Sequence, residues 1–275
     1  MIRSGTRDTH QMSAAAAQYE IRTVTGAEAD RALDLAESVW GQRPLNDAVL
    51  RALELAGSYV SVALDGSGRQ IGMCLGIVGV HDDHLHLHSH LAAVDPAHRG
   101  AGIGRALKRH QREWCLERGI TTISWTFDPL IHANARFNLH HLGARGERYL
   151  VELYGHMEDE INRGDASDRL LIRWDLDDER TRIALDRPLP TPDVAHADVA
   201  LADDGGRPRR VDTDAAVRLI ATPADAVALR RDDPEMARAW RLAVRETMLQ
   251  AFAEGLEPVA VTTDRRYLFT RPEDR

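Results

Sequence analysis

The chain has 275 residues, of which 43% are hydrophobic and 28% are charged, and its formal net charge is −8 at pH 7. This length allows one large core or two small ones, and the acidic balance argues against a general nucleic-acid binder, which is usually basic. No apolar run approaches the ~20 residues that a membrane-spanning helix needs. The sequence therefore predicts neither a nucleic-acid partner nor a membrane partner.

The N-terminal segment and the two cysteines bear on where the protein works. Residues 1–18 contain no hydrophobic stretch of the kind that a signal peptide requires, and we expect a disordered tail there. Cys74 and Cys115 fall within apolar strand and helix patterns, which favours buried free thiols over a disulfide. Arginine and alanine are abundant and Lys108 is the only lysine, a composition typical of a GC-rich genome. These features predict a bacterial, cytoplasmic protein.

Hydrophobic periodicity predicts alternating helices and strands over the first two thirds of the chain. Asn46 is a suitable N-cap for a helix that ends at Gly57, and the segment 65–68, Asp-Gly-Ser-Gly, joins two β-branched runs as a hairpin turn does. In chain order, the predicted elements are strand 19–24, helices 28–40 and 46–56, strands 59–64, 70–80 and 85–94, a helix from 103 to about 119, strand 120–127, helix 133–141, and strands 147–154 and 170–176.

The rest of the chain is predicted to form a linker and then a further ordered region. Residues 177–212 are expected to be a linker or long loop, because their second part is rich in Pro, Asp, Gly and Ala. The elements predicted after it are strand 217–221, a short helix, a long helix from 234 to 255, and strands 258–263 and 267–270. The apolar stripe of the long helix indicates a core or an interface. Three arginines off that stripe are expected in solvent or at the rim of an acceptor pocket: Arg238, Arg241 and Arg245.

A glycine-rich turn carries the most specific functional signal. The segment from Arg99 to Gly104 reads Arg-Gly-Ala-Gly-Ile-Gly, follows a predicted strand and opens an amphipathic helix. Glycines at such a turn let the backbone approach a ligand closely, and the helix start supplies unpaired N–H groups and the positive end of the helix dipole. The turn is therefore a candidate phosphate cradle. The helix face predicted to be buried carries Ile103, Ala106, Leu107, His110 and Trp114.

The spacing Arg-x-x-Gly-x-Gly resembles the coenzyme A pyrophosphate loop of the GNAT superfamily of N-acetyltransferases. The predicted element order over residues 19–176 is similar to that of the superfamily, which implies an α/β (α+β) fold with a mixed, mostly antiparallel sheet flanked by helices. Residues 213–275 would then be a C-terminal α/β extension. Further segments, among them 87–90, 125–130 and 134–138, are similar to a little-characterised bacterial branch with such an extension.

The resemblance implies a coenzyme A thioester, acetyl-CoA or succinyl-CoA, as co-substrate. The end of the fourth strand would offer backbone groups to the pantetheine arm, and the glycine turn would hold the pyrophosphate. Lys108 and Arg112, farther along the helix, either reach phosphates or lie on a solvated face. The cofactor-binding residues implied are Ala92, Ala93, Val94, Arg99, Gly100, Ala101, Gly102, Ile103, Gly104, Arg105, Asn134 and Asn138.

Histidines alternate along the fourth strand and share one of its faces. A His-x-His pair on a strand can bind zinc, but no further ligands at a suitable spacing accompany it, and we predict no metal. His88 and His90 lie toward the strand end where the thioester would be. Imidazole titrates near neutral pH, so either histidine is a candidate base for the acceptor amine, directly or through water. Asp128 is the third catalytic candidate.

The proton donor for the departing thiolate is left open by the sequence. Many members of the superfamily use a tyrosine four residues before the glycine that ends the fourth helix. Counting back from Gly143 gives Leu139 in this chain. Asn134, Asn138, Asp128 or Tyr154 could position groups there, or the thiolate leaves without a dedicated acid.

The predicted reaction is acyl transfer to the amine of a small metabolite, with an amino acid as the leading acceptor. An arginine that pairs with a carboxylate would suit such an acceptor. The alternative is a non-catalytic acyl-CoA-binding or regulatory protein. The C-terminal extension is expected to cover the acceptor side or to form a homodimer interface. The candidate substrate-binding residues are Trp125, Tyr154, Arg163 and Arg169.

Overall fold

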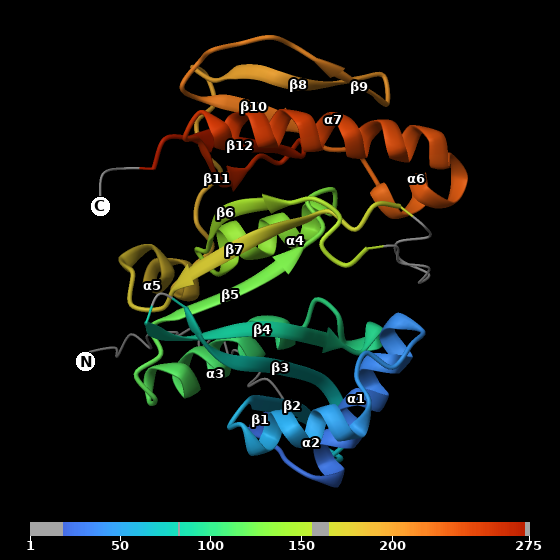
Figure 1. Ribbon diagram of the computed structural model, residues 1–275, viewed down its shortest axis with the longest axis vertical. Helices are drawn as coiled ribbons and strands as arrows, with labels where there is room; N and C mark the ends of the chain where they lie inside the picture. The colour runs from blue at the N-terminus through green and yellow to red at the C-terminus, as the bar shows by residue number, and fades with distance from the viewer. Residues whose placement is uncertain (1–18, 82, 156–164, 273–275) are drawn as a thin grey trace, which may run out of the picture.

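The computed structural model describes residues 19–81, 83–155 and 165–272, and Figure 1 shows their arrangement. The predictions for residues 1–18 and for Arg163 lie outside the described residues. Two sheets are stacked along the long axis of the molecule, with the first sheet and its helices below and the C-terminal sheet above. In the described part of the chain, no helix has both the length and the apolar character needed to cross a membrane.

The first sheet has seven strands in the order β1-β2-β3-β4-β5-β7-β6. Neighbouring strands are antiparallel throughout, except that β4 and β5 are parallel. Helices flank this sheet, which confirms the predicted fold class. The strands are β1 (Tyr19–Thr23), β2 (Tyr59–Asp65), β3 (Gln70–His81), β4 (His84–Val94), β5 (Thr122–Phe127), β6 (Arg145–Leu150) and β7 (Arg169–Asp175). The helices are α1 (Ala27–Trp40), α2 (Asp47–Leu55), the 3₁₀ turn η1 (Pro96–His98), α3 (Ile103–Leu116), α4 (His132–Arg136), the π-helical turn η2 (Phe137–His141) and α5 (Glu179–Asp186).

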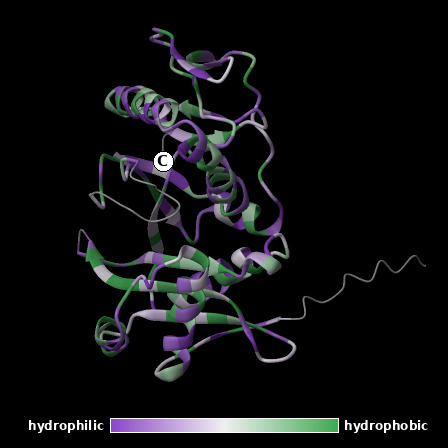
Figure 2. Cartoon of the chain, turned by 90° about the vertical axis from the view of Figure 1, so that its right-hand side faces the viewer, coloured by the Kyte–Doolittle hydropathy of each residue, from purple (hydrophilic) through white to green (hydrophobic). Residues whose placement is uncertain are grey.

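Each face of β2, β3 and β4 has its own helical layer. Helices α1 and α2 bury one face, where Leu33 and Leu50 pack with Val62 and Met73. Helix α3 covers the other face, and it lies very close to β3 because two strand residues there are glycines. A Cβ added at Gly72 would lie 2.9 Å from the Cγ2 atom of Ile103. In Figure 2, hydrophobic colour runs along the strands of the first sheet, as expected for strands covered by helices.

The C-terminal region forms a second sheet, in the order β11-β12-β10-β8-β9, with α7 lying across it (Figure 1). Its strands are β8 (Asp198–Asp204), β9 (Arg207–Arg210), β10 (Arg218–Ala221), β11 (Glu257–Val261) and β12 (Arg266–Thr270), and its helices are α6 (Ala226–Asp232) and α7 (Pro234–Ala253). Trp240 and Val244 of α7 belong to the same buried cluster as Trp174 of β7 and Leu87 of β4. The two sheets therefore share one continuous core.

Hydrogen bonds and one close strand contact also join the C-terminal region to η2, to the loop after β5 and to β6. The Val261 N–H donates to Nε2 of His140 over 3.0 Å, and the Tyr267 hydroxyl donates to the Pro129 carbonyl over 2.8 Å. At Gly146 a Cβ would lie 2.2 Å from Cγ of Pro258, so glycine is required for β6 to approach β11 this closely. The extension is thus packed against β6 and the α4–η2 segment rather than merely tethered to the domain (Figure 1).

Four predictions about local structure need correction. The range 177–212 is not a bare linker, because it contains α5, β8 and β9. The strand predicted to reach residue 154 ends at Leu150 and is followed by turns. The helix predicted over 133–141 changes to a π-helical turn from Phe137. Arg241, expected on a solvated or rim position, is 1% exposed. The domain boundaries themselves remain a prediction.

Candidate active site

The central feature of the site is the point where β4 and β5 separate. These parallel strands pair only at Leu87 with Ile123 and at His88 with Ser124 among the described residues. The pairing with β3 shifts register between Ser89 and Leu91, which makes His90 the extra residue of a bulge. Beyond this point the β4 edge that faced β5 runs on to Val94 without it. Its backbone N–H and C=O groups are therefore placed to bind an extended ligand rather than a neighbouring strand.

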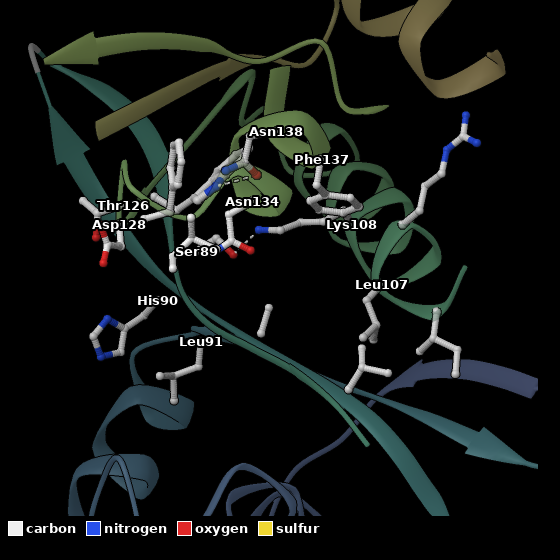
Figure 3. A pocket seen from close by; sticks show the side chains of 18 of the residues that line it. Ser89, His90, Leu91, Leu107, Lys108, Thr126, Asp128, Asn134, Phe137 and Asn138 are labelled. Carbon is white, nitrogen blue, oxygen red and sulfur yellow. Dashed lines mark hydrogen bonds between the residues drawn. The ribbon is translucent and has the colours of Figure 1, made fainter. Parts of the chain in front are cut away.

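A cavity of about 1150 Å³ opens at this separation (Figure 3). Its walls come from β4, the glycine turn with α3, β5, and the α4–η2 segment, and the α1–α2 loop adds Trp40, Gln42 and Pro44. Most of the predicted site residues lie on these walls, namely His90, Asp128, Ala92, Val94, Arg99, Gly100, Gly102, Ile103, Gly104, Arg105, Asn134, Asn138, Trp125, Tyr154 and Arg169. Of the predicted residues that the structure describes, those that do not line it are His88, Ala93 and Ala101.

The glycine turn has the conformation that a phosphate cradle needs. Gly100 and Gly102 both have φ of +81°, a left-handed conformation that residues with a Cβ adopt rarely. Gly102 is the N-cap of α3 and supplies no side-chain acceptor. The first N–H groups of α3 are therefore not capped by that residue and, at the positive end of the helix, are available to an anion.

The arginines at the two ends of this turn have different surroundings. Arg99 is exposed and lines the cavity. Arg105 donates from Nη2 to the carbonyls of Ala184, over 3.0 Å, and Leu185, over 2.7 Å. The Arg105 guanidinium thus holds α5 against the start of α3, while its backbone remains part of the turn.

Of the two histidine candidates, His90 is the one that reaches the cavity. His88 lies one residue before the point of separation, with Nδ1 at 3.2 Å from the Ser124 hydroxyl. Burial, together with the neighbouring charges of His90, His86 and Lys108, lowers the pKa of His88 to about 4. Burial also lowers the pKa of His90. Both imidazoles are therefore neutral at neutral pH, and His90 is the one placed to accept a proton in the cavity.

Asp128, the third catalytic candidate, is bound to two arginines of the C-terminal region. Oδ1 and Oδ2 accept from Nη1 and Nη2 of Arg241 over 2.9 and 3.0 Å, and Oδ2 also accepts from Arg230. Burial raises the pKa of the Asp128 carboxyl, but the charges of Arg241 and Arg230 outweigh burial and lower it overall. A carboxylate held in its ionised form by two guanidinium groups is a poor base. We interpret Asp128 as a link between the site and the C-terminal region.

The same kind of contact recurs around the loop that precedes β7. Asp165 accepts from Nε of Arg230 and from Nη2 of Arg241, each over 2.9 Å. Asp168 accepts from Nε and Nη2 of Arg245 over 2.8 Å, and from the Tyr149 hydroxyl over 2.7 Å. Buried carboxylates and guanidinium groups with several partners each form a network rather than isolated pairs. We call Asp128, Asp165, Asp168, Arg230, Arg241 and Arg245 the acidic–basic network.

Arg169, Tyr154 and Trp125 lie on the side of the cavity next to this network. The Arg169 guanidinium is 5.4 Å from the centre of the Tyr154 ring, and burial lowers the pKa of Arg169. The Tyr154 hydroxyl is 3.0 Å from Oγ1 of Thr126. Nε1 of Trp125 donates to Oδ1 of Asn138 over 3.2 Å, which fixes one wall of the cavity. The structure thus brings together three of the four predicted substrate-binding residues.

Comparison with known proteins identifies the domain that carries this site. Residues 28–143 match the model of the acetyltransferase (GNAT) family. Residues 28–143 are therefore a domain of the GNAT type. The match covers the glycine turn, β4 and β5, and it ends at Gly143, so the β6–β7 segment and the whole C-terminal region lie beyond it. No curated protein is significantly similar to the chain in sequence.

Several solved structures are similar to the GNAT domain. The ribosomal-protein-S18-alanine N-acetyltransferase from Escherichia coli is 16% identical, with a TM-score of 0.47 over 57% of this chain and 94% of its own. The putative acetyltransferase yncA from Salmonella typhimurium, solved with acetyl-CoA, is 19% identical, with a TM-score of 0.48 over 59% of this chain and 96% of its own. A phosphinothricin acetyltransferase from Sinorhizobium meliloti, in complex with AcCoA, is 19% identical, with a TM-score of 0.48 over 57% of this chain and 88% of its own. Identities this low say nothing about the substrate of this chain.

The leaving-group side of the GNAT domain departs from the pattern that the resemblance implied. Leu139, at the expected tyrosine position, is fully buried and does not line the cavity. The π-helical turn instead directs Phe137, Asn138 and His141 to the cavity wall. Burial lowers the pKa of His141, so its ring is neutral at neutral pH.

The histidine row of β4 is not part of a metal cluster. In residues 19–81, 83–155 and 165–272, no three His, Cys, Asp or Glu side chains are grouped so that they could hold a metal ion. Cys74 and Cys115 are both free and buried, as the sequence predicted.

Two parts of the site were missed by the sequence. Lys108 was expected to reach phosphates or to face solvent. It is instead 5% exposed, and its side chain runs along the cavity wall to Ser89 on β4. Its position as the only lysine, between Leu107 and Gln111 on the buried face of α3, was a signal that could have been noticed. The acidic–basic network had no such signal, because its arginines and carboxylates are far apart in sequence.

Proposed function

We propose that this chain transfers an acyl group from an acyl-CoA thioester to the primary amine of a small metabolite. Acetyl and succinyl are the proposed acyl groups, and an amino acid is the proposed acceptor. The observation that carries the proposal is the combination, in one cavity, of a β4 edge released from β5 and a glycine turn at the start of α3. The free thiols and the composition support a reaction in a bacterial cytoplasm.

The donor would lie along β4. The N–H groups from Gly100 to Arg105 would hold the pyrophosphate, and the backbone between Leu91 and Val94 would bind the pantetheine arm as a neighbouring strand would. At the proposed site the thioester then lies next to the bulge at His90. No metal is required by this scheme, because the charge of the diphosphate is met by backbone dipoles and by the exposed Arg99.

The acceptor amine would enter from the side of Tyr154 and Arg169. A neutral His90 can take the proton that the amine loses as it attacks the thioester carbonyl. Holding the amine and the thioester together in one cavity replaces a bimolecular encounter by a positioned one. The buried Arg169 guanidinium supports an acceptor with a carboxylate, because such a pair forms two parallel hydrogen bonds.

A second candidate function is acyl-CoA binding without turnover. The observation that favours it is Leu139, a buried apolar residue at the position where the superfamily resemblance implied a tyrosine acid. A regulatory acyl-CoA-binding protein needs the donor half of the cavity and no proton donor.

A turnover screen tests both functions. Release of free thiol from acetyl-CoA and succinyl-CoA is measured with each amino acid and, in parallel, with the amine obtained by removing its carboxylate. We expect release with at least one amino acid and little with its decarboxylated partner. Thiol release with decarboxylated amines alone would contradict the amino-acid acceptor. Binding of acyl-CoA by calorimetry without release for any amine would favour the second candidate.

A further inference from the structure

A buried serine and a buried lysine line the cavity, and no role in the proposed function uses them. Nζ of Lys108 donates to Oγ of Ser89 over 2.6 Å and to Oε1 of Gln111 over 3.1 Å. Both Ser89 and Lys108 line the cavity although each is only 5% exposed. Figure 3 shows the Lys108 side chain crossing from α3 to Ser89 on β4, beside Asn134 and Phe137.

The surroundings of Lys108 leave its charge uncompensated. In the described part of the chain, no carboxylate forms an ion pair with it within 4.0 Å. The titratable groups around it are Cys74 on β3, Cys115 on α3 and His88 on β4. Burial raises the pKa of the Cys74 thiol, and raises that of Cys115 to about 12, so neither thiol is ionised at neutral pH. The hydrogen bonds to Ser89 and Gln111 and the face of the Trp125 ring, 4.3 Å from Nζ, are the contacts that favour the charged form.

Burial lowers the pKa of Lys108. An ammonium group in this situation gives up a proton more readily than a solvated lysine does. A free thiol has a pKa of about 8.5. Because burial shifts the pKa of Lys108 below its ordinary value, Lys108 is a stronger acid, and so a better proton donor toward a thiolate, than a solvated lysine.

Ser89 stands where the reacting sulfur would be. It is the first β4 residue beyond the last pair with β5 and the residue before His90. With the pyrophosphate on the glycine turn and the pantetheine along the released β4 edge, the thioester reaches the bulge at this end of the cavity. Since Lys108 donates to Oγ, the hydroxyl proton of Ser89 is free to point elsewhere. Among the described residues, Sγ of Cys74, at 3.7 Å, is the other atom that Oγ contacts.

The other ionisable side chains on the cavity wall are in the wrong protonation state to give up a proton or lie elsewhere, as His98 does in the turn before α3. His90 and His141 are neutral at neutral pH, because burial lowers both pKa values. Asp128 is held in its ionised form, as described above. Tyr154 is 43% exposed and lies on the acceptor side with Thr126. Ser89 with Lys108 behind it remains as the pair at the donor end.

We propose that the Ser89 hydroxyl protonates the departing coenzyme A thiolate and that Lys108 returns a proton to Ser89. This inference rests on the proposed acyl transfer. The amine nitrogen bonds to the thioester carbon and loses its proton to His90. The C–S bond then breaks, the sulfur takes the proton of Ser89, and Ser89 takes one from Lys108. As the products leave, protonated His90 releases its proton to solvent and neutral Lys108 takes one from solvent, so both groups return to their starting states.

The test compares Lys108→Met and Ser89→Ala with the wild-type chain, using the best amine from the turnover screen. We expect kcat to fall by about 10²–10⁴ in each variant, with the Kd for coenzyme A unchanged. The kcat of the wild type should also fall at alkaline pH, as Lys108 loses its proton, and Lys108→Met should lack this alkaline limb. Arg109→Met, one residue along α3 and exposed, is the matched control and should behave as wild type.

A second variant separates proton donation from charge and from folding. Lys108→Arg keeps a cation, but a guanidinium does not release its proton in this pH range, so it should be as slow as Lys108→Met. Recovery of activity in Lys108→Arg, an unchanged alkaline limb in Lys108→Met, or a loss confined to coenzyme A affinity would each overturn the relay. Each of these outcomes would overturn the relay while the wild-type chain still transfers the acyl group, so the proposed function would stand. If the wild type transfers to no amine, the proposed function fails and the relay with it.

Discussion

The two sides of the cavity are built in opposite ways. The donor side is almost continuous in sequence, from Ser89 through the glycine turn to Lys108, and it offers mainly backbone groups. The acceptor side is assembled from β5, the loop before β7, α6 and α7. It is held by ion pairs in which Arg230, Arg241 and Arg245 meet carboxylates 65 to 113 residues away in sequence.

This difference has a physical reason. A diphosphate and an extended pantetheine arm can be bound by N–H groups that any sequence with the correct turn supplies. An acceptor with its own shape and charge needs side chains in fixed positions, and buried guanidinium and carboxylate groups stay in place only when each has several partners. We therefore expect substitutions on the donor side to change acyl-CoA binding or chemistry, and those on the acceptor side to change stability.

The largest expected effect is on the chemistry, at His90. His90→Ala should lower kcat/KM by about 10²–10⁴ because the general base is lost, while acyl-CoA still binds. In the wild type the neutral imidazole is the active form, so activity should fall on the acid side with an apparent pKa below the ordinary 6.5. Steady-state rates between pH 5 and 9 measure both effects. His88→Ala is the matched control, and an equal loss there would contradict the assignment to His90.

The next effect is on stability, at Arg241. Arg241→Met removes a buried guanidinium shared by Asp128 and Asp165 and should lower the free energy of unfolding by about 3–5 kcal/mol. Urea denaturation followed by circular dichroism measures it. Acyl-CoA affinity at low temperature should be unchanged, since the donor side is separate. Substitution of the exposed Arg238 by Met is the control. Loss of acyl-CoA binding in a folded Arg241→Met chain would contradict the view that the two sides of the cavity act separately.

A smaller effect, on acyl-CoA binding rather than mainly on stability, is expected at Gly102. Gly102→Val places a β-branched side chain at φ +81°, which costs about 1–3 kcal/mol. Much of this should appear as weaker acyl-CoA binding, by about 5- to 150-fold, because the turn must shift to relieve it. Calorimetric titration with coenzyme A is the measurement. Gly66→Ala, in the β2–β3 hairpin with nothing near its Cβ, is the control. Equal affinities would show that the turn does not hold the nucleotide.

The smallest effect is expected at Tyr267, which joins the C-terminal region to the loop after β5. Tyr267→Phe removes one buried hydrogen bond to the Pro129 carbonyl and should cost about 1 kcal/mol of stability. Pro129 follows Asp128 directly, so the acceptor KM should rise more than the acyl-CoA KM. A change in acyl-CoA KM alone would contradict the view that the C-terminal region supports only the acceptor side.

The sequence by itself predicted most elements of the first sheet and the glycine turn at the start of α3. The alternation of residues 59–94, the turn glycines at 100 and 102, and the amphipathic helix after them are local patterns, and each appears in the structure where the sequence predicted it. Such patterns can be predicted from the sequence because strand alternation, helical period and positive φ depend on residues that are neighbours in the chain.

Only the tertiary structure decided which side chains meet. It placed His90 rather than His88 at the cavity, because a one-residue bulge shifts the strand there. It buried Arg241, predicted to lie in solvent or at a rim, because Asp128 and Asp165 compensate its charge, and it turned Lys108 inward onto Ser89. Burial of a charge depends on partners brought from distant segments, and neither their distance nor their direction is written in a local pattern.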